Sequence, residues 1–164
     1  MKSLVLTFLL LSFGMIGIAQ EKALNYKELQ KVLPSTINGY SLSGDIDGSS
    51  FEMNDMSYSV ASASYEKGDS ELNISIMDYQ GAQTLYMSAS MAWSAGMKYE
   101  DDEQEAHGVE YENAKGWLVN GKVDNTSELV LGYKERYIIT ISITETSNNS
   151  AESIYKSLNL NSLP

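Results

Sequence analysis

The stretch YSVASASYEKGDSELNISIM, residues 58 to 77, carries the clearest structural pattern in the chain. On both sides of Gly68-Asp69, apolar or small residues alternate with polar ones, and Leu72, Ile74 and Ile76 are the clearest members of the pattern. A period of two is typical of a strand with one buried face. Gly68 and Asp69 provide the turn between two such strands. The stretch therefore predicts a β-hairpin with strands over 58–65 and 72–77.

A second hairpin is predicted from SELVLGY and RYIITISITET, residues 127 to 133 and 136 to 146. Four residues of its second strand alternate with polar or smaller ones and share one predicted core face: Tyr137, Ile139, Ile141 and Ile143. Two further short strands are expected within 108–121, with Asn120-Gly121 as a turn.

Three helices are expected around these strands. Asn25 caps a short helix over 25–33, with Glu28 completing a capping-box-like pair and Pro34 ending it. In residues 82–97 the spacing of Ala82, Leu85, Ala89, Trp93 and Gly96 predicts a long helix with one packed face. A short helix carrying Ile154, Tyr155 and Leu158 closes the chain, and the polar residues 43–55 are expected to form a loop.

This order predicts an α+β fold, in which an antiparallel β-sheet packs a long helix and short terminal helices. From the 58–77 hairpin to the last helix, the order of elements resembles that of Mog1/PsbP-like domains. The resemblance covers about two-thirds of the chain and concerns element order alone. It implies a similar fold, and no functional residue is carried over with it.

The first 19 residues have the pattern of a secretory signal peptide. Lys2 gives a positive start, an apolar run follows, and Gly17-Ile18-Ala19 is a small-x-small cleavage site. The apolar run is shorter than the roughly 20 residues of a membrane-spanning helix. We therefore expect cleavage before Gln20, a single domain over 20–164, a secreted or periplasmic protein, and no insertion into the membrane after cleavage.

Composition limits the chemistry. The chain has no cysteine, which excludes disulfides, thiolate ligands, a cysteine nucleophile and a lipidated cysteine. The formal net charge is −11, and loss of Lys2 with residues 1–19 makes it −12. Such an acidic domain repels nucleic acid. No phosphate-binding loop or dinucleotide fingerprint is present, so no cofactor is expected.

Asp78 is the first candidate for chemistry, because it lies between a predicted strand and a predicted helix. A catalytic aspartate needs a partner, and the adjacent residues are only Tyr79 and Gln80. A carboxylate that precedes a helix can also accept hydrogen bonds from the backbone N–H groups at the positive, N-terminal end of that helix. We therefore expect Asp78 to cap the helix or to stabilise the turn.

His107 is the only histidine, so a transition-metal site would depend on carboxylates such as Glu103, Glu105 and Glu110. That spacing is common in acidic loops. Because no serine lies in a nucleophile elbow, a catalytic triad has no nominated nucleophile. His107 is expected to be an exposed residue beside a turn at Gly108, and no metal site is predicted.

A calcium site is the other ionic alternative. Asp45-Ile46-Asp47-Gly48-Ser49 alternates oxygen ligands with a glycine, and Glu52 follows. It lacks the later bidentate glutamate of an EF-hand loop. The run Glu100–Glu105 has five carboxylates among six residues and is expected to be a solvated loop.

Apolar residues offer two candidate binding surfaces. Met87 and Met91 lie four apart in the predicted long helix, where core packing is the expected role. Trp117 is consistent either with core packing or with an exposed platform for a sugar or peptide.

The leading functional hypothesis is therefore a small secreted or periplasmic binding or accessory domain without catalysis, whose partner is a small molecule or a protein. The alternative is a carboxylate-based hydrolase in which Asp78 works with Glu110 or Glu112 as acid and base. Two carboxylates converging in a cleft favour the enzyme, whereas a flat sheet face favours the binding module.

Overall fold

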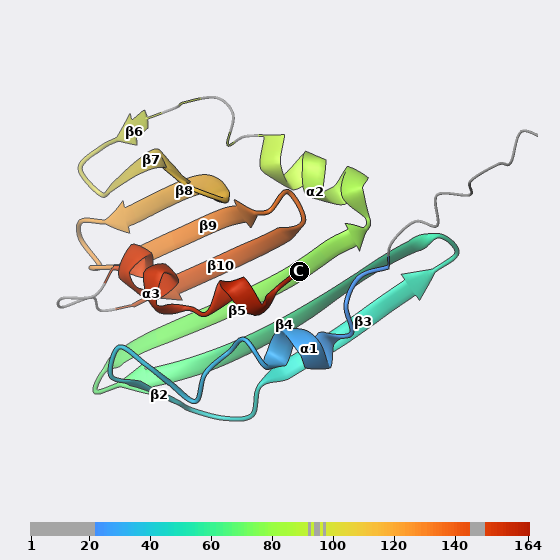
Figure 1. Ribbon diagram of the computed structural model, residues 1–164. Coiled ribbons are helices and arrows are strands. Elements are labelled where there is room, and N and C mark those ends of the chain that lie inside the picture. Colours follow the sequence, from blue (N-terminus) through green and yellow to red (C-terminus); the bar gives the residue numbers. More distant parts are fainter. Residues whose placement is uncertain (1–21, 92, 94–95, 97, 145–149) are drawn as a thin grey trace, which may run out of the picture.

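The computed structural model describes residues 22–91, 93, 96, 98–144 and 150–164, and its main feature is one antiparallel sheet of ten strands (Figure 1). The order is β1-β2-β4-β5-β10-β9-β8-β7-β6, and β3 pairs with β4 outside this path. The strands are β1 (Thr36–Ile37), β2 (Tyr40–Leu42), β3 (Asp47–Met53), β4 (Met56–Lys67), β5 (Ser70–Gly81), β6 (Lys98–Glu100), β7 (Gln104–Tyr111), β8 (Ala114–Gly121), β9 (Ser127–Tyr133) and β10 (Tyr137–Ile143). The helices are α1 (Tyr26–Gln30), α2 (Gln83–Ser90), α3 (Ala151–Ser157) and the 3₁₀ helix η2 (Leu160–Ser162). The predicted signal peptide, residues 1–19, lies outside the described residues.

Both predicted hairpins are confirmed, and they form the centre of the sheet. Lys67 pairs with Ser70 across the Gly68-Asp69 turn, where Gly68 has a φ of 62° that glycine adopts without strain. β10 joins the two hairpins, because Ile139 pairs with Ile76 of β5 and with Leu131 of β9. The strands β4 and β5 run longer than predicted, β9 covers the predicted residues 127–133, and β10 is shorter than the predicted 136–146.

One face of the sheet, called the covered face below, carries the hydrophobic core. The predicted core residues of β10 are confirmed: Tyr137, Ile139, Ile141 and Ile143 are each 0% exposed. α1, α3 and η2 all lie over this face (Figure 1). Apolar side chains of these helices and of the residues after them join the same core: Leu29, Val32, Leu33, Ala151, Ile154, Leu158, Leu160 and Leu163.

The first predicted helix is present and begins at its predicted cap, but it is shorter than predicted: α1 covers Tyr26–Gln30, whereas a helix over 25–33 that ends at Pro34 was expected. The Asn25 side chain accepts a hydrogen bond from the Lys27 backbone N–H at 3.0 Å, which caps α1. Glu28 does not take part in the cap, since its carboxylate accepts a hydrogen bond from Lys31 Nζ at 2.6 Å. Leu29 turns toward the sheet and is fully buried.

The predicted long helix is wrong, and with it the α+β description. α2 covers only Gln83–Ser90, and the molecule is mainly a large antiparallel sheet with small helices. Of the side chains in α2, only Tyr86 is buried. The start of the helix has no side-chain cap at Ala82, and the Ser88 hydroxyl donates to the Thr84 carbonyl, a contact that weakens helices. Helix length in proteins depends on tertiary burial, which α2 lacks.

The predicted loop over 43–55 is also wrong, because most of it is the strand β3. All seven residues of β3 are exposed. The segment therefore has no alternation of apolar residues that could have predicted a strand. It forms because its backbone pairs with one edge of β4, from Asp47 opposite Ser62 to Met53 opposite Met56.

The acidic run 100–105 forms a hairpin rather than a solvated loop. Glu100 ends β6, and its carboxylate pairs with Lys122 at 2.8 Å. The Asp101 side chain accepts hydrogen bonds from the backbone N–H groups of Glu103 and Gln104, so it shapes the turn into β7. The two strands predicted within 108–121 are present as parts of β7 and β8. Asn120 and Gly121, however, end β8 and are not a separate turn.

Candidate functional site

Asp78 lies inside β5 and does not cap α2, so the capping prediction is wrong. Its carboxylate is 0% exposed and binds the guanidinium of Arg136 through two hydrogen bonds, of 2.9 Å to Nε and 2.7 Å to Nη2. The backbone N–H of Gln80 donates to it at 2.9 Å, and that of Leu24 at 2.8 Å. Each carboxylate oxygen thus accepts two hydrogen bonds, which leaves Asp78 no role in proton transfer.

The chain before α1 is held against the sheet through this ion pair. Leu24 donates to Asp78, and the neighbouring Ala23 N–H donates to the Ser57 hydroxyl at 3.0 Å. An irregularity in the pairing of β4 with β5, between Ser57 and Ser59, lies at the same place. Arg136 was missed by sequence reasoning, although it is the only arginine in the chain. Two features could have identified it as the partner of a buried carboxylate: it is the single arginine of the sequence, and a guanidinium fits a carboxylate through two hydrogen bonds.

The carboxylate pair of the hydrolase hypothesis is not brought together. Asp78 lies on β5 and Glu110 on β7, with β10, β9 and β8 between them. At a strand spacing of about 4.8 Å, this separates them by about 19 Å. Glu112 follows β7 at the turn into β8 and is separated by the same strands.

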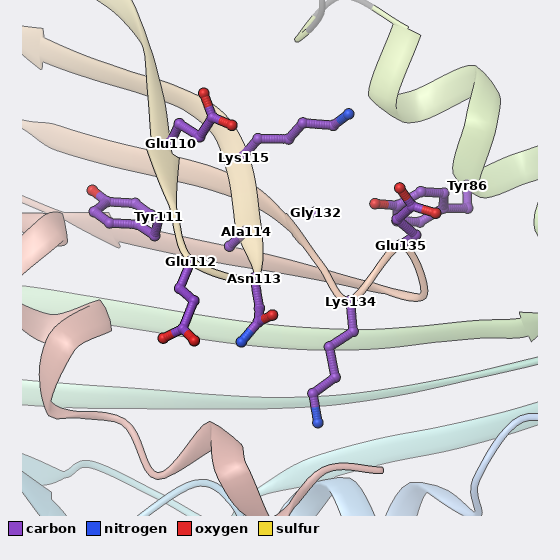
Figure 2. Close-up of a pocket in the computed structure, with 10 residues that line it drawn as sticks. All are labelled: Tyr86, Glu110, Tyr111, Glu112, Asn113, Ala114, Lys115, Gly132, Lys134 and Glu135. Carbon is purple, nitrogen blue, oxygen red and sulfur yellow. The ribbon is translucent and has the colours of Figure 1, made fainter.

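A hollow of about 300 Å³ at the β7–β8 turn is lined by several charged residues, but their side chains point in different directions (Figure 2). Glu110 and Lys115 extend to one side, whereas Glu112, Asn113 and Lys134 point to the other. Lys134 Nζ is engaged by the Leu163 carbonyl at 2.7 Å. The hollow therefore lacks converging acid and base groups.

The second face of the sheet, called the open face below, is largely uncovered. Tyr86 and Trp93 pack onto it over Gly132, which has no side chain to displace them. Two rows of side chains cross its centre, the first from Val60 through Met77 to Ile138, the second from Ser62 through Ser75, Thr140 and Val130 to Trp117. Ile138 is 7% exposed, and the other side chains of both rows are half-buried.

Aromatic rings extend this surface toward the β3–β4 hairpin. Phe51 stacks on Tyr58 with ring centroids 5.0 Å apart, and Tyr58 lies 6.2 Å from Tyr79. Phe51 remains 38% exposed. The open face thus presents an apolar strip to solvent, unlike an ordinary solvated sheet face, which alternates to polar residues.

The charges of the open face are almost all negative. By register and alternation, five exposed carboxylates lie on this side of the sheet: Asp47, Glu66, Glu71, Glu110 and Glu128. Lys115 is the one lysine that the described strand pairings place on the same side. The apolar strip therefore has an acidic surround.

The remaining sequence candidates take different positions from those expected. His107 is half-buried within β7 on the covered face, opposite Leu118, so neither its predicted exposure nor a turn at Gly108 is found. Met87 and Met91 are 67% and 77% exposed, and their predicted core role is wrong. Trp117 is half-buried on the open face, between Gly108 and Val130.

The acidic side chains of the calcium candidate do not all lie on the same side of the sheet. Asp47 of β3 faces the open side, whereas Glu52, five residues on, points to the covered side and pairs with Lys22. Within the described part of the chain, no three side chains of His, Cys, Asp or Glu lie close enough to hold a metal ion.

No protein-family model and no curated protein matches the sequence. Among the described residues, no helix is long and apolar enough to cross a membrane.

Proposed function

We propose that this chain is a secreted or periplasmic binding module without catalysis, and that its open face binds a positively charged protein. The observation that carries the proposal is the apolar strip on that face, formed by Phe51, Tyr58, Met77 and Val60 and continued by Trp117. Apolar side chains that remain partly exposed and have a polar surround are characteristic of interaction sites.

The acidic surround selects the chemistry of the partner. Carboxylates such as Glu71 and Glu128 attract a basic surface and speed its approach. A second copy of the chain is a poorer partner, because two open faces would bring two acidic surrounds together. Nucleic acid is repelled by the same charges. The signal-peptide pattern of residues 1–19 supports a partner outside the cytoplasm.

Site-specific photo-crosslinking in cells that make the full chain tests this proposal. A photoreactive amino acid at Ser75 or Thr140, in the centre of the open face, is expected to give a discrete adduct with a protein that has a basic surface. The same amino acid at Lys27, an exposed position of α1, is the control and is expected to give none.

Charge variants then decide whether the adduct is specific. We expect the double variant Glu71→Gln and Glu128→Gln to reduce the adduct strongly, and the matched pair Asp102→Asn and Glu103→Gln, in the β6–β7 turn, to leave it unchanged. Added salt should also reduce it, because exposed charges are screened. Adducts that form equally at Lys27, that resist neutralisation of the open face, or that never form would refute the proposal.

A further inference from the structure

A second hollow, of about 210 Å³, lies on the other side of the β7–β8 turn, between this turn and the C-terminal helices. It is separate from the open face, because its residues belong to the covered face and to the segment that packs on it. Its lining residues used below are Tyr111, Glu112, Asn113, Tyr133, Tyr155 and Asn161.

Tyrosine rings form the walls of this hollow. The rings of Tyr111 and Tyr155 have centroids 4.8 Å apart and planes inclined by 38°, so they meet as a wedge rather than as a flat stack. The Tyr133 hydroxyl donates to the Leu160 carbonyl at 3.4 Å, which links β9 to η2 beneath them. Burial raises the pKa of Tyr155 and of Tyr133, so both phenols are neutral near pH 7. The walls of the hollow are therefore aromatic and uncharged near pH 7.

Polar side chains at the rim of the hollow are unoccupied by other contacts. The side chains of Glu112, Asn113 and Asn161 form no hydrogen bond with any other described residue. Glu112 and Asn113 point to the same side of the turn, away from Glu110 and Lys115 (Figure 2). A carboxylate and two amides thus lie at one opening with free acceptors and donors.

The combination of aromatic walls and free amide and carboxylate groups fits a sugar. The C–H face of a pyranose packs on an aromatic ring, and its hydroxyls pair with carboxylate and amide groups, which accept and donate together. The volume is below the roughly 300–1,000 Å³ of sites for drug-sized ligands, which suits a single ring. We propose that this hollow binds one neutral pyranose ring, as a unit of a glycan.

Nuclear magnetic resonance titration of the folded protein with neutral hexoses and N-acetylhexosamines tests the proposal directly. At least one of these sugars is expected to give saturable shifts, with a Kd in the millimolar range, that are confined to residues 111–113 and 155–161. Such an affinity corresponds to a few weak contacts with a small ligand.

Variants at the rim identify the site. Asn113→Ala and Glu112→Gln are each expected to weaken binding of that sugar by about tenfold, which is the effect of losing one hydrogen bond to a ligand. The matched controls are Asn73→Ala, on the open face, and Glu103→Gln, in the β6–β7 turn, and both should keep the Kd within about twofold. All four positions are exposed, so the variants should fold, and their spectra verify this.

Three results would overturn the proposal. The first is the absence of saturable shifts with every sugar of the panel. The second is binding that Asn113→Ala and Glu112→Gln leave unchanged. The third is saturable binding of a proline-rich peptide at these residues with no response to sugars, because it would make the hollow a peptide pocket.

Discussion

At the scale of single residues, the contact that most affects stability is the Asp78–Arg136 pair. Asp78 is 0% exposed and Arg136 only 12%, so removing either charge leaves the other buried without its counter-charge. We expect Asp78→Asn to lower the free energy of unfolding by about 3–5 kcal/mol in urea denaturation. The control is Glu28→Gln, which removes an exposed pair with Lys31 and should cost less than about 0.5 kcal/mol. Similar losses in the two variants would show that the buried pair adds nothing beyond a surface contact.

At the scale of elements, the alternation in β10 has a measurable consequence. Ile141 is fully buried on the covered face, whereas its neighbour Thr140 is half-buried on the open face. Ile141→Ala should destabilise the protein by about 2–5 kcal/mol, because truncation leaves a cavity in the core. Thr140→Ala should cost well under half as much. The unfolding midpoints of the two variants, measured by heat or urea, are compared with that of the parent protein. Equal losses of stability would mean that both faces of β10 are packed alike.

The same alternation explains which elements could be predicted from the sequence. The hairpins of β4 with β5 and of β9 with β10 bury one face, so their apolar residues recur at every second position. β3 has no buried residue and α2 has one. In neither segment, therefore, does burial impose a period of apolar residues from which the structure could be predicted. β3 is held by its pairing with β4, and α2 is held by the contact of Tyr86 with Gly132. Both are contacts between distant parts of the chain, so the sequence of the segment itself does not show them.

At the scale of the whole molecule, the candidate sites depend on contacts between residues that are distant in the sequence, and these contacts cannot be predicted from a local pattern. The serine and threonine residues of the open face look like ordinary solvent-facing positions in the sequence, and the strand pairings place them beside the apolar strip. The tyrosine-walled hollow joins Tyr111 to Tyr155, which are far apart in the chain. Trp117 was recognised as a possible platform, but its face of the sheet was set by the register of β8 with β9.

Buried phenols also give the whole molecule a dependence on alkaline pH. Burial raises the pKa of Tyr65 and of Tyr137 to about 12, with the Asp78 charge adding to the effect at Tyr137. In the unfolded chain these groups titrate near pH 10. The native state therefore holds the protons more tightly, so this contribution to stability is complete below about pH 10 and is lost as the pH rises toward 12. Urea midpoints measured across this range should fall steeply.

Tyr137→Phe separates this effect from general charge repulsion in an acidic protein. The Tyr137 hydroxyl is buried and has no hydrogen-bond partner among the described residues, so its removal leaves no new unpaired group. We expect the variant to be as stable as the parent or slightly more stable at pH 7, because burying an unpaired hydroxyl is unfavourable. Above pH 10 it should lose stability less steeply, since one proton fewer is released on unfolding. A variant that loses stability as steeply as the parent would show that Tyr137 does not cause the alkaline transition. The cause would then be the net negative charge, which grows above pH 10 as lysine side chains lose their protons, and added salt would relieve it.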